Sequence, residues 1–266
     1  MSGHAGRGPR LTRRTLLGGA LGWGLLETLA DNEAMAAPLA SAAVQQPRVH
    51  TRREWAAKPA RRPARVLLRA PDHIVVHHTA SPNITDTSLA QARDLSRAIQ
   101  RFHMRTRGWD DTGQQLTISR GGHVMEGRNR SLAAILAGRH VVGAQALNHN
   151  EHTIGIENEG TYSAANVPEA LWESLADTCA WLCEAYRLNP YDAIVGHRDY
   201  VDTTCPGDVL YSRLPELRHH VAQRLGLPPQ PDDGLASKGR RVAKLAPADP
   251  YEAPDLSGIM PGRDHR

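Results

Sequence analysis

Short apolar runs separated by polar, turn-forming stretches predict a set of buried β-strands. Residues 74–77, 153–157 and 193–196 are rich in Ile and Val and are four or five residues long, which is typical of strands buried in a sheet. Two further runs, 115–120 and 123–127, are joined by a Gly-Gly pair, which is a favourable hairpin turn. These five segments are therefore expected to supply the strands.

Longer segments with apolar residues at helical spacing predict helices between and after these strands. The segment from Leu89 to Met104 places its apolar side chains on one face, which we interpret as core packing. The polar loop before it offers three candidate N-caps, Thr85, Asp86 and Thr87.

Two more helices are expected at about residues 168–186 and 214–225. Strands and helices in this order predict an α/β fold, a single domain over residues 46–228 with a central mixed β-sheet flanked by helices. We interpret the Pro- and Arg-rich stretch up to residue 72 as a lead-in, and the stretch up to about residue 150 as a variable loop.

Both ends of the chain differ from this domain. Residues 1–42 contain Arg13-Arg14 ahead of a Gly-rich apolar run, which looks like a twin-arginine export signal. The run is too short and too lightly apolar for a stable membrane anchor, although an uncleaved anchor and an ordinary basic N-terminus are the alternatives. We expect a mature protein in the cell wall or secreted, without stable membrane insertion after signal cleavage. Residues 229–266 read as a mostly disordered tail.

Composition and charge change this picture little. The chain has 266 residues and a formal net charge of +4, a mild basic balance that is weak evidence for an anionic partner. No motif supports nucleic-acid binding, and we expect a monomer. Three cysteines are few for a disulfide scaffold. Cys179 and Cys183 lie one turn apart in a predicted helix, where their sulfurs are poorly aimed for a bridge, so we interpret them as small core residues.

Cys205 and His197 follow the strand at 193–196 in one polar loop. Imidazole nitrogen and thiolate sulfur are ligands that Zn²⁺ prefers, and a third is expected from His77 or His78 at the end of the strand at 74–77. Three protein ligands with a fourth position for water are typical of catalytic zinc. The alternatives are that these histidines are surface groups and that Cys205 is half of a disulfide.

Six motifs then occur in a fixed order along residues 50–225. They are Val75-Val76-His77-His78-Thr79-Ala80, the stretch from Phe102 to Gly113 ending in Trp109-Asp110-Asp111-Thr112-Gly113, Val142-Gly143-Ala144, Thr153-Ile154-Gly155-Ile156-Glu157, Gly196-His197-Arg198-Asp199 and Thr204-Cys205-Pro206-Gly207. Each motif alone is weak, but together they resemble the peptidoglycan recognition proteins and the related zinc N-acetylmuramoyl-L-alanine amidases.

This resemblance implies hydrolysis of the amide between N-acetylmuramic acid and the L-alanine of the stem peptide, with peptidoglycan as the partner. It also implies a Zn²⁺ cofactor held by His77, His197 and Cys205. Substrate contacts implied by the resemblance involve four further residues, His78, Thr79, Trp109 and Asn150. Trp109 has a core anchor as its alternative role.

The sequence departs from the family pattern at two positions. Gln114 stands where many members carry a catalytic Tyr, and Gln145 stands where many carry His. Glutamine cannot act as a general acid or base near neutral pH. Glu157 can, and the resemblance implies that it is the general base beside a zinc-activated water. Thr203 is a candidate for holding the oxyanion, with ordinary loop polarity as the alternative.

Three other functions remain open at this point. A non-catalytic peptidoglycan-binding module is favoured by Gln114 and disfavoured by Cys205. A protein with a structural zinc needs a fourth protein ligand, for which His78 and His123 are the candidates. The third is an amidase that acts on another acylated peptide.

Overall fold

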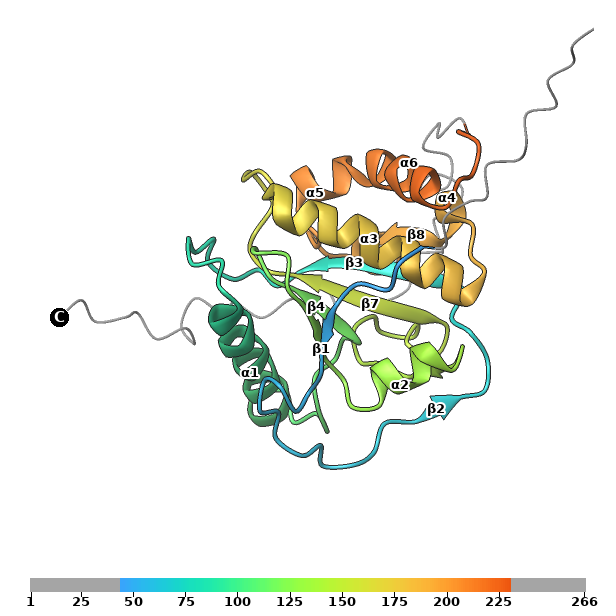
Figure 1. Cartoon of the computed structure of the whole chain (residues 1–266). Coiled ribbons are helices and arrows are strands. Elements are labelled where there is room, and N and C mark those ends of the chain that lie inside the picture. Colours follow the sequence, from blue (N-terminus) through green and yellow to red (C-terminus); the bar gives the residue numbers. More distant parts are fainter. Residues whose placement is uncertain (1–43, 231–266) are drawn as a thin grey trace, which may run out of the picture. The chain divides into compact units, whose positions relative to one another are not determined.

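A computed structural model of the chain describes residues 44–230 (Figure 1). The predicted export signal at 1–42 lies outside the described residues, and the predicted tail does so from residue 231. The elements are β1 (Val49–His50), β2 (Val66–Leu67), β3 (His73–His78), α1 (Leu89–Arg105), β4 (Leu116–Ile118), β5 (Val124–Glu126), α2 (Ser131–Leu136), β6 (His140–Val141), β7 (Thr153–Asn158), α3 (Glu169–Tyr186), α4 (Pro190–Ala193), β8 (Ile194–Gly196), the 3₁₀ turn η1 (His197–Asp199), α5 (Asp208–Ser212) and α6 (Leu214–Arg224).

Six of the strands form one mixed sheet in the order β1-β5-β4-β7-β3-β8. The strands β4, β7, β3 and β8 run parallel to one another, whereas β5 runs antiparallel to β4. A small second sheet pairs β2 with β6. Helices flank the main sheet (Figure 1), and the predicted α/β fold with a central mixed sheet is confirmed.

The main hydrophobic core lies between one face of this sheet and the helices α3, α5 and α6 (Figure 1). Alternate residues of β3 and β7, such as Ile74, Val76 and Ile156, point into it and are fully buried. Cys179 and Cys183 of α3 belong to the same core as free thiols, which confirms their interpretation as small core residues. Helix α1 packs on the other side of the sheet, where Ala92 meets Met125 of β5.

The opposite face of the sheet carries the polar residues of interest. Because side chains alternate along a strand, His77 of β3 points away from the face that Ile74 and Val76 present to the main core. Its register partner in β7 is Glu157, so these two side chains leave the same face as neighbours. The same strands thus present the hydrophobic core on one face of the sheet and the polar pair His77 and Glu157 on the other.

Several short elements were not predicted from the sequence. The strands β1, β2 and β6 have two residues each, which is too short for a periodic pattern. The stretch interpreted as a variable loop contains the six-residue helix α2, and α4 and α5 are shorter still, with four and five residues. The N-cap prediction for α1 was wrong, because Ser88 accepts the hydrogen bond from the Gln91 amide.

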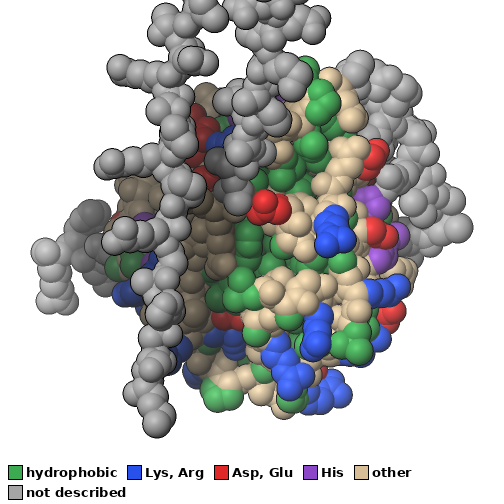
Figure 2. Space-filling model, turned by 45° about the vertical axis from the view of Figure 1, so that its right-hand side comes forward, with side chains coloured by type: hydrophobic (Ala, Val, Ile, Leu, Met, Phe, Trp, Pro, Cys, Tyr) green, Lys and Arg blue, Asp and Glu red, His purple; other side chains and the backbone are tan. Residues whose placement is uncertain are grey.

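The surface carries mixed charge without a large uniform patch on the face shown in Figure 2. Lys and Arg side chains gather in its lower part, and His side chains lie beside acidic ones at its right-hand edge. No helix among residues 44–230 is long and apolar enough to cross a membrane.

Candidate metal centre

Two strand ends and one loop bring the predicted metal ligands together. Gly196 of β8 is the register partner of Val76 in β3, so the next residue on each strand, His197 and His77, leave the sheet side by side. Their ring centroids are 4.3 Å apart. The loop after η1 returns Cys205 to the same place, and the donor atoms of His77, His197 and Cys205 all lie within 4.8 Å of one another.

The donor set suits a zinc ion. All three side chains are buried, and the distance from Cys205 Sγ to His77 Nδ1 is 3.7 Å. Two ligands of a tetrahedral zinc with ordinary Zn–S and Zn–N bond lengths would be roughly 3.6 Å apart. Burial, followed by the charge of His197, holds the pKa of His77 well below its usual value although the hydrogen bond with Gln145 raises it. His77 is therefore neutral at pH 7, as a metal ligand must be.

Gln145 fixes the orientation of the His77 ring. Thr153 Oγ1 donates to the His149 carbonyl, so it accepts from Gln145 Nε2 at 2.7 Å. This leaves Gln145 Oε1 to accept from His77 Nε2 at 2.6 Å. The Nε2 atom then carries the proton, and Nδ1 presents its lone pair toward Cys205. The sequence marked Gln145 as a departure from the family pattern but gave no sign of this contact.

A set of hydrogen bonds holds the loop that carries Cys205. Arg198, adjacent to a predicted ligand, donates from its backbone amide and Nε to the Cys205 carbonyl, and from its guanidinium to the Thr204 carbonyl. Thr203 Oγ1 accepts from the Cys205 amide at 3.2 Å. The Cys205 sulfur itself accepts from the His78 amide at 3.4 Å. The thiol is thus positioned by backbone and side-chain bonds on both sides.

Glu157 is the acidic residue beside this cluster. Its strand partners are His77 on one side and Thr117 on the other. Its Oε2 atom is buried and has no hydrogen-bond partner among the described residues. Burial raises the pKa of Glu157 to about 8. A buried carboxylate without a partner is costly, so a cation or a proton at this face would stabilise it.

Other polar residues of the predicted site have internal partners. Gln114, at the position of the family Tyr, donates from Nε2 to Thr117 Oγ1. Thr79 is buried, and its hydroxyl bonds with Ser81 and accepts from the Gly160 amide. The roles predicted for Thr79 and for the remaining candidates stay predictions.

The last three predicted substrate contacts lie in different surroundings. His78 follows His77, so strand alternation directs its ring to the opposite face, where Nδ1 accepts from the Tyr162 amide. Trp109 stacks on His103 with ring centroids 4.6 Å apart. Asn150 uses its side-chain oxygen to accept from the amides of Gln145 and Ala146, so it shapes the loop that presents Gln145.

A structural zinc would require a fourth protein ligand. His78 points away from the cluster, and His123 lies against His50 with ring centroids 5.9 Å apart. Within residues 44–230, no fourth His, Cys, Asp or Glu joins His77, His197 and Cys205. The described part of the chain thus offers three donors here, one fewer than a structural zinc site uses.

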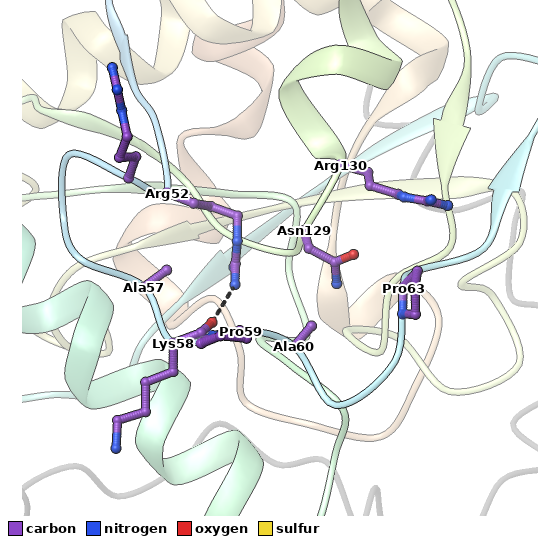
Figure 3. Close-up of a pocket in the computed structure, with 9 residues that line it drawn as sticks. Arg52, Ala57, Lys58, Pro59, Ala60, Pro63, Asn129 and Arg130 are labelled. Carbon is purple, nitrogen blue, oxygen red and sulfur yellow. Dashed lines mark hydrogen bonds between the residues drawn. The ribbon is translucent and has the colours of Figure 1, made fainter.

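The surface also contains a pocket with a volume of about 540 Å³ (Figure 3). Its walls come from the segment at 52–63 and from Asn129 and Arg130, with Arg52 Nη2 donating to the Lys58 carbonyl at 3.1 Å. None of the predicted metal ligands lines it, and it contains no His, Cys or acidic side chain. The pocket therefore has the basic groups for an anion but none of the groups for the predicted chemistry.

Comparison with known proteins identifies amidases and peptidoglycan-recognition proteins as similar to this chain. The model of the N-acetylmuramoyl-L-alanine amidase family matches residues 67–208. The human protein of that name is 34% identical over 198 residues, which are 73% of this chain and 32% of the human protein. Peptidoglycan-recognition protein LB of Drosophila melanogaster is 26% identical over 203 residues, or 75% of this chain and 82% of that protein.

A solved structure extends the similarity to three dimensions. The complex of tracheal cytotoxin with the ectodomains of peptidoglycan recognition proteins LCa and LCx aligns with a TM-score of 0.56 and 26% identity. The alignment covers 63% of this chain and 95% of that one. By contrast, the chain spans only about a third of the length of the mammalian amidases that it matches.

Proposed function

The chain belongs to the N-acetylmuramoyl-L-alanine amidase family, and from this premise we propose that it hydrolyses the amide bond between N-acetylmuramic acid and L-alanine in peptidoglycan. The observation that carries the proposal is the position of Glu157. It faces the cluster of His77, His197 and Cys205 from the neighbouring strand, with a buried oxygen that has no partner among the described residues. A metal cluster with an adjacent base is the arrangement that metal-assisted hydrolysis requires.

Each residue has a distinct part in this proposal. His77, His197 and Cys205 would hold Zn²⁺, which supplies polarisation of the scissile carbonyl and a lowered pKa for a water molecule beside it. Glu157 takes a proton from the attacking water and passes it to the departing alanine nitrogen. Burial raises the pKa of Glu157 to about 8, and a cation held by the three ligands would favour its charged form, which is the form that accepts a proton. Thr203, whose oxygen already accepts from the Cys205 amide, has its hydroxyl proton left to donate to the developing oxyanion.

A non-catalytic binding module is the second candidate, and one observation favours it. Gln114 replaces the Tyr that many catalytic members carry, and its amide bonds to Thr117 beside Glu157. Under this alternative the chain would bind peptidoglycan fragments without cleaving them. This alternative assigns no function to the buried carboxylate of Glu157.

The test is digestion of purified peptidoglycan by the full chain loaded with Zn²⁺, with products read by mass spectrometry. Wild type should release stem peptides that begin at L-alanine. Glu157→Gln keeps the size of the side chain but cannot accept the proton, so kcat should fall about 10²–10⁴-fold while zinc remains bound. Cys205→Ser should lose both zinc and product.

Glu159→Gln is the matched control. Glu159 lies two residues beyond Glu157, and its carboxylate is already bound by the Arg120 amide and by Gln91. This variant should retain turnover close to wild type once folded. If zinc-loaded wild type binds peptidoglycan but releases no free stem peptide, the amidase proposal is contradicted and the non-catalytic binding module remains. Full activity in Glu157→Gln would support the amidase activity but contradict the role of Glu157 as the general base.

Location outside the cytoplasmic membrane is part of the same proposal, because the substrate is there. Arg13 and Arg14 are the residues that support it. Replacement of both by Lys should leave the chain in the cytoplasm, which cell fractionation would detect. Unchanged export of that variant would contradict the twin-arginine route.

A further inference from the structure

A second group of metal-binding side chains lies at the other end of β3. Asp72, His73 and His152 each offer a ligand atom, and these atoms lie within 4.8 Å of one another. The Asp72 Oδ1 atom is 2.5 Å from His73 Nδ1 and 2.8 Å from His152 Nδ1. His73 and His77 are four residues apart on β3, roughly 13 Å along the strand, so this group is separate from the first cluster.

We propose that Asp72, His73 and His152 form a second site for a borderline divalent cation such as Zn²⁺. Two imidazoles and one carboxylate are the donors that such ions take in proteins, and the remaining positions would be filled by water. The site is partly open to solvent, since the Asp72 side chain is 61% exposed and the His152 side chain 32%. An ion can therefore enter without unfolding the domain.

The present geometry is that of the protonated, hydrogen-bonded form of this site. Donor atoms around a tetrahedral zinc would be roughly 3.3 Å apart, which is slightly more than the two distances at Asp72. Asp72 Oδ1 accepts from the Nδ1 atoms of both histidines, and an ion would replace these two ring protons. The exposed Asp72 side chain can make the small movement required.

The surroundings of His152 also fit a metal ligand. With Nδ1 directed to Asp72, its other nitrogen, Nε2, lies 3.0 Å from His149 Nδ1, and it can donate there once Nδ1 binds an ion. Tyr200 packs against the His149 ring with centroids 4.2 Å apart. The Asp72 amide donates to the His152 carbonyl at 2.9 Å, which fixes the two ligands relative to each other.

An ion at this site would join the start of β3 to the loop that presents Gln145. That loop is continuous from Gln145 to His152, and Asn150 and Thr153 bond it internally. Occupancy should therefore hold Gln145 in place against His77. The existence of the second site is independent of the proposed amidase activity. Its consequence for His77, however, rests on the proposed function of His77 as a metal ligand of the amidase.

The test is metal stoichiometry. The full chain is stripped with a chelator, dialysed against Zn²⁺ and analysed for zinc per chain, with isothermal titration as a second readout. Wild type should bind two ions, and Cys205→Ser and His152→Asn should each bind one. Asp72→Asn keeps an acceptor for the two histidines but removes the charge, so it should weaken only the second ion.

His219→Asn is the matched control, because His219 lies on α6 and bonds to the Tyr191 hydroxyl. It should still bind two ions. One ion in wild type that is lost in Cys205→Ser and kept in His152→Asn would overturn the proposal. Two ions in both His152→Asn and Asp72→Asn would overturn it equally. One ion lost in His152→Asn and kept in Cys205→Ser would support the second site and contradict the first.

A spectroscopic measurement separates the two environments. Cu²⁺ added to Cys205→Ser should give an electron paramagnetic resonance signal with nitrogen hyperfine structure from His73 and His152. The signal should lose a nitrogen when His152→Asn is added to Cys205→Ser in a double variant. An identical spectrum in both variants would place the ion elsewhere and reject the assignment.

Discussion

At the scale of single residues, the candidate metal centre depends on side chains that direct other side chains. His77 can present only one nitrogen to a metal, and Gln145 decides which one by accepting from the other. Thr153 in turn decides which end of the Gln145 amide faces His77. Arg198 and Thr203 hold the backbone of Cys205 in place, through its carbonyl and its amide respectively. The ligands therefore depend on a surrounding layer for their geometry.

Gln145→Met tests this layer. Methionine has nearly the same size and shape but cannot accept a hydrogen bond from His77, so zinc affinity should fall about 10–100-fold. Competition with a chromophoric chelator would measure it. Gln100→Met is the control, because Gln100 is also a buried amide with several hydrogen bonds, to Lys58 and Asp111. Equal zinc affinities in wild type and Gln145→Met would contradict the orienting role.

At the scale of elements, the ends of strands and helices do the positioning. Parallel strands β3, β7 and β8 end at the same edge, which brings His77, Glu157 and His197 together. The loop before α1 is closed by Ser88, which caps the helix, while the Asp86 carboxylate accepts from the Ser88 amide. Ser88 is the residue that directly precedes the helix, and with extended dihedrals its hydroxyl reaches the Gln91 amide. Asp86, one of the three predicted caps, instead binds the backbone of the residue that caps.

Ser88→Ala should lower the free energy of unfolding by about 1 kcal/mol, because the Gln91 amide loses its acceptor. Urea denaturation followed by circular dichroism would measure it. Ser88→Asp keeps an acceptor and should stay close to wild type. Thr85→Ala removes a predicted but unused cap and should change stability by less than about 0.5 kcal/mol. A larger loss in Thr85→Ala than in Ser88→Ala would contradict the assignment.

At the scale of the whole molecule, burial of histidine rings makes folding depend on pH. Several of them sit in or beside the sheet with their pKa values held below the usual range, chiefly by burial. His103 is the clearest case outside the candidate metal centre. Burial, with the charges of Arg107 and Arg128, lowers its pKa to about 3, and its Nδ1 accepts from the Gly113 amide.

The sign of the pH effect follows from proton uptake. An unfolded histidine binds a proton below about pH 6.5, whereas folded His103 does so only near pH 3. Between these values the unfolded chain holds the extra proton, so the stability present above pH 6.5 is lost progressively as the pH falls. From pH 7 to pH 5, His103 should account for a loss of about 2 kcal/mol.

His103→Asn measures this contribution. The Asn side-chain oxygen can accept from the Gly113 amide but does not titrate, so the loss of stability between pH 7 and pH 5 should be about 2 kcal/mol smaller than in wild type. Urea unfolding of the chelator-treated chain at both pH values gives the comparison. His219→Asn, at a half-buried position on α6, serves as the control for loss of one histidine. The same loss in wild type and His103→Asn would show that His103 is not responsible.

The amino-acid sequence by itself determined the longer strands, the main helices and the ordered motifs. These depend on local periodicity and on residue types that lie close together in the chain, as in the runs that became β3, β7 and α3. Local chemistry singled out His197 and Cys205 with His77 or His78 as candidate zinc ligands, and the resemblance carried by the ordered motifs added Glu157 and the choice of His77. The two-residue strands and the helices of four to six residues escaped prediction because they are too short to show a periodic pattern.

Only the tertiary structure decided which side chains meet. Gln145 lies 68 residues from His77 in the chain, and Cys205 lies 128 residues from it. The contact between Asp72 and His152 spans 80 residues. Sheet register and loop packing create these neighbours, and neither is a property of a local segment. For this reason the chemical identity of the candidate site could be predicted from the sequence, whereas its orientation and the second cluster required the fold.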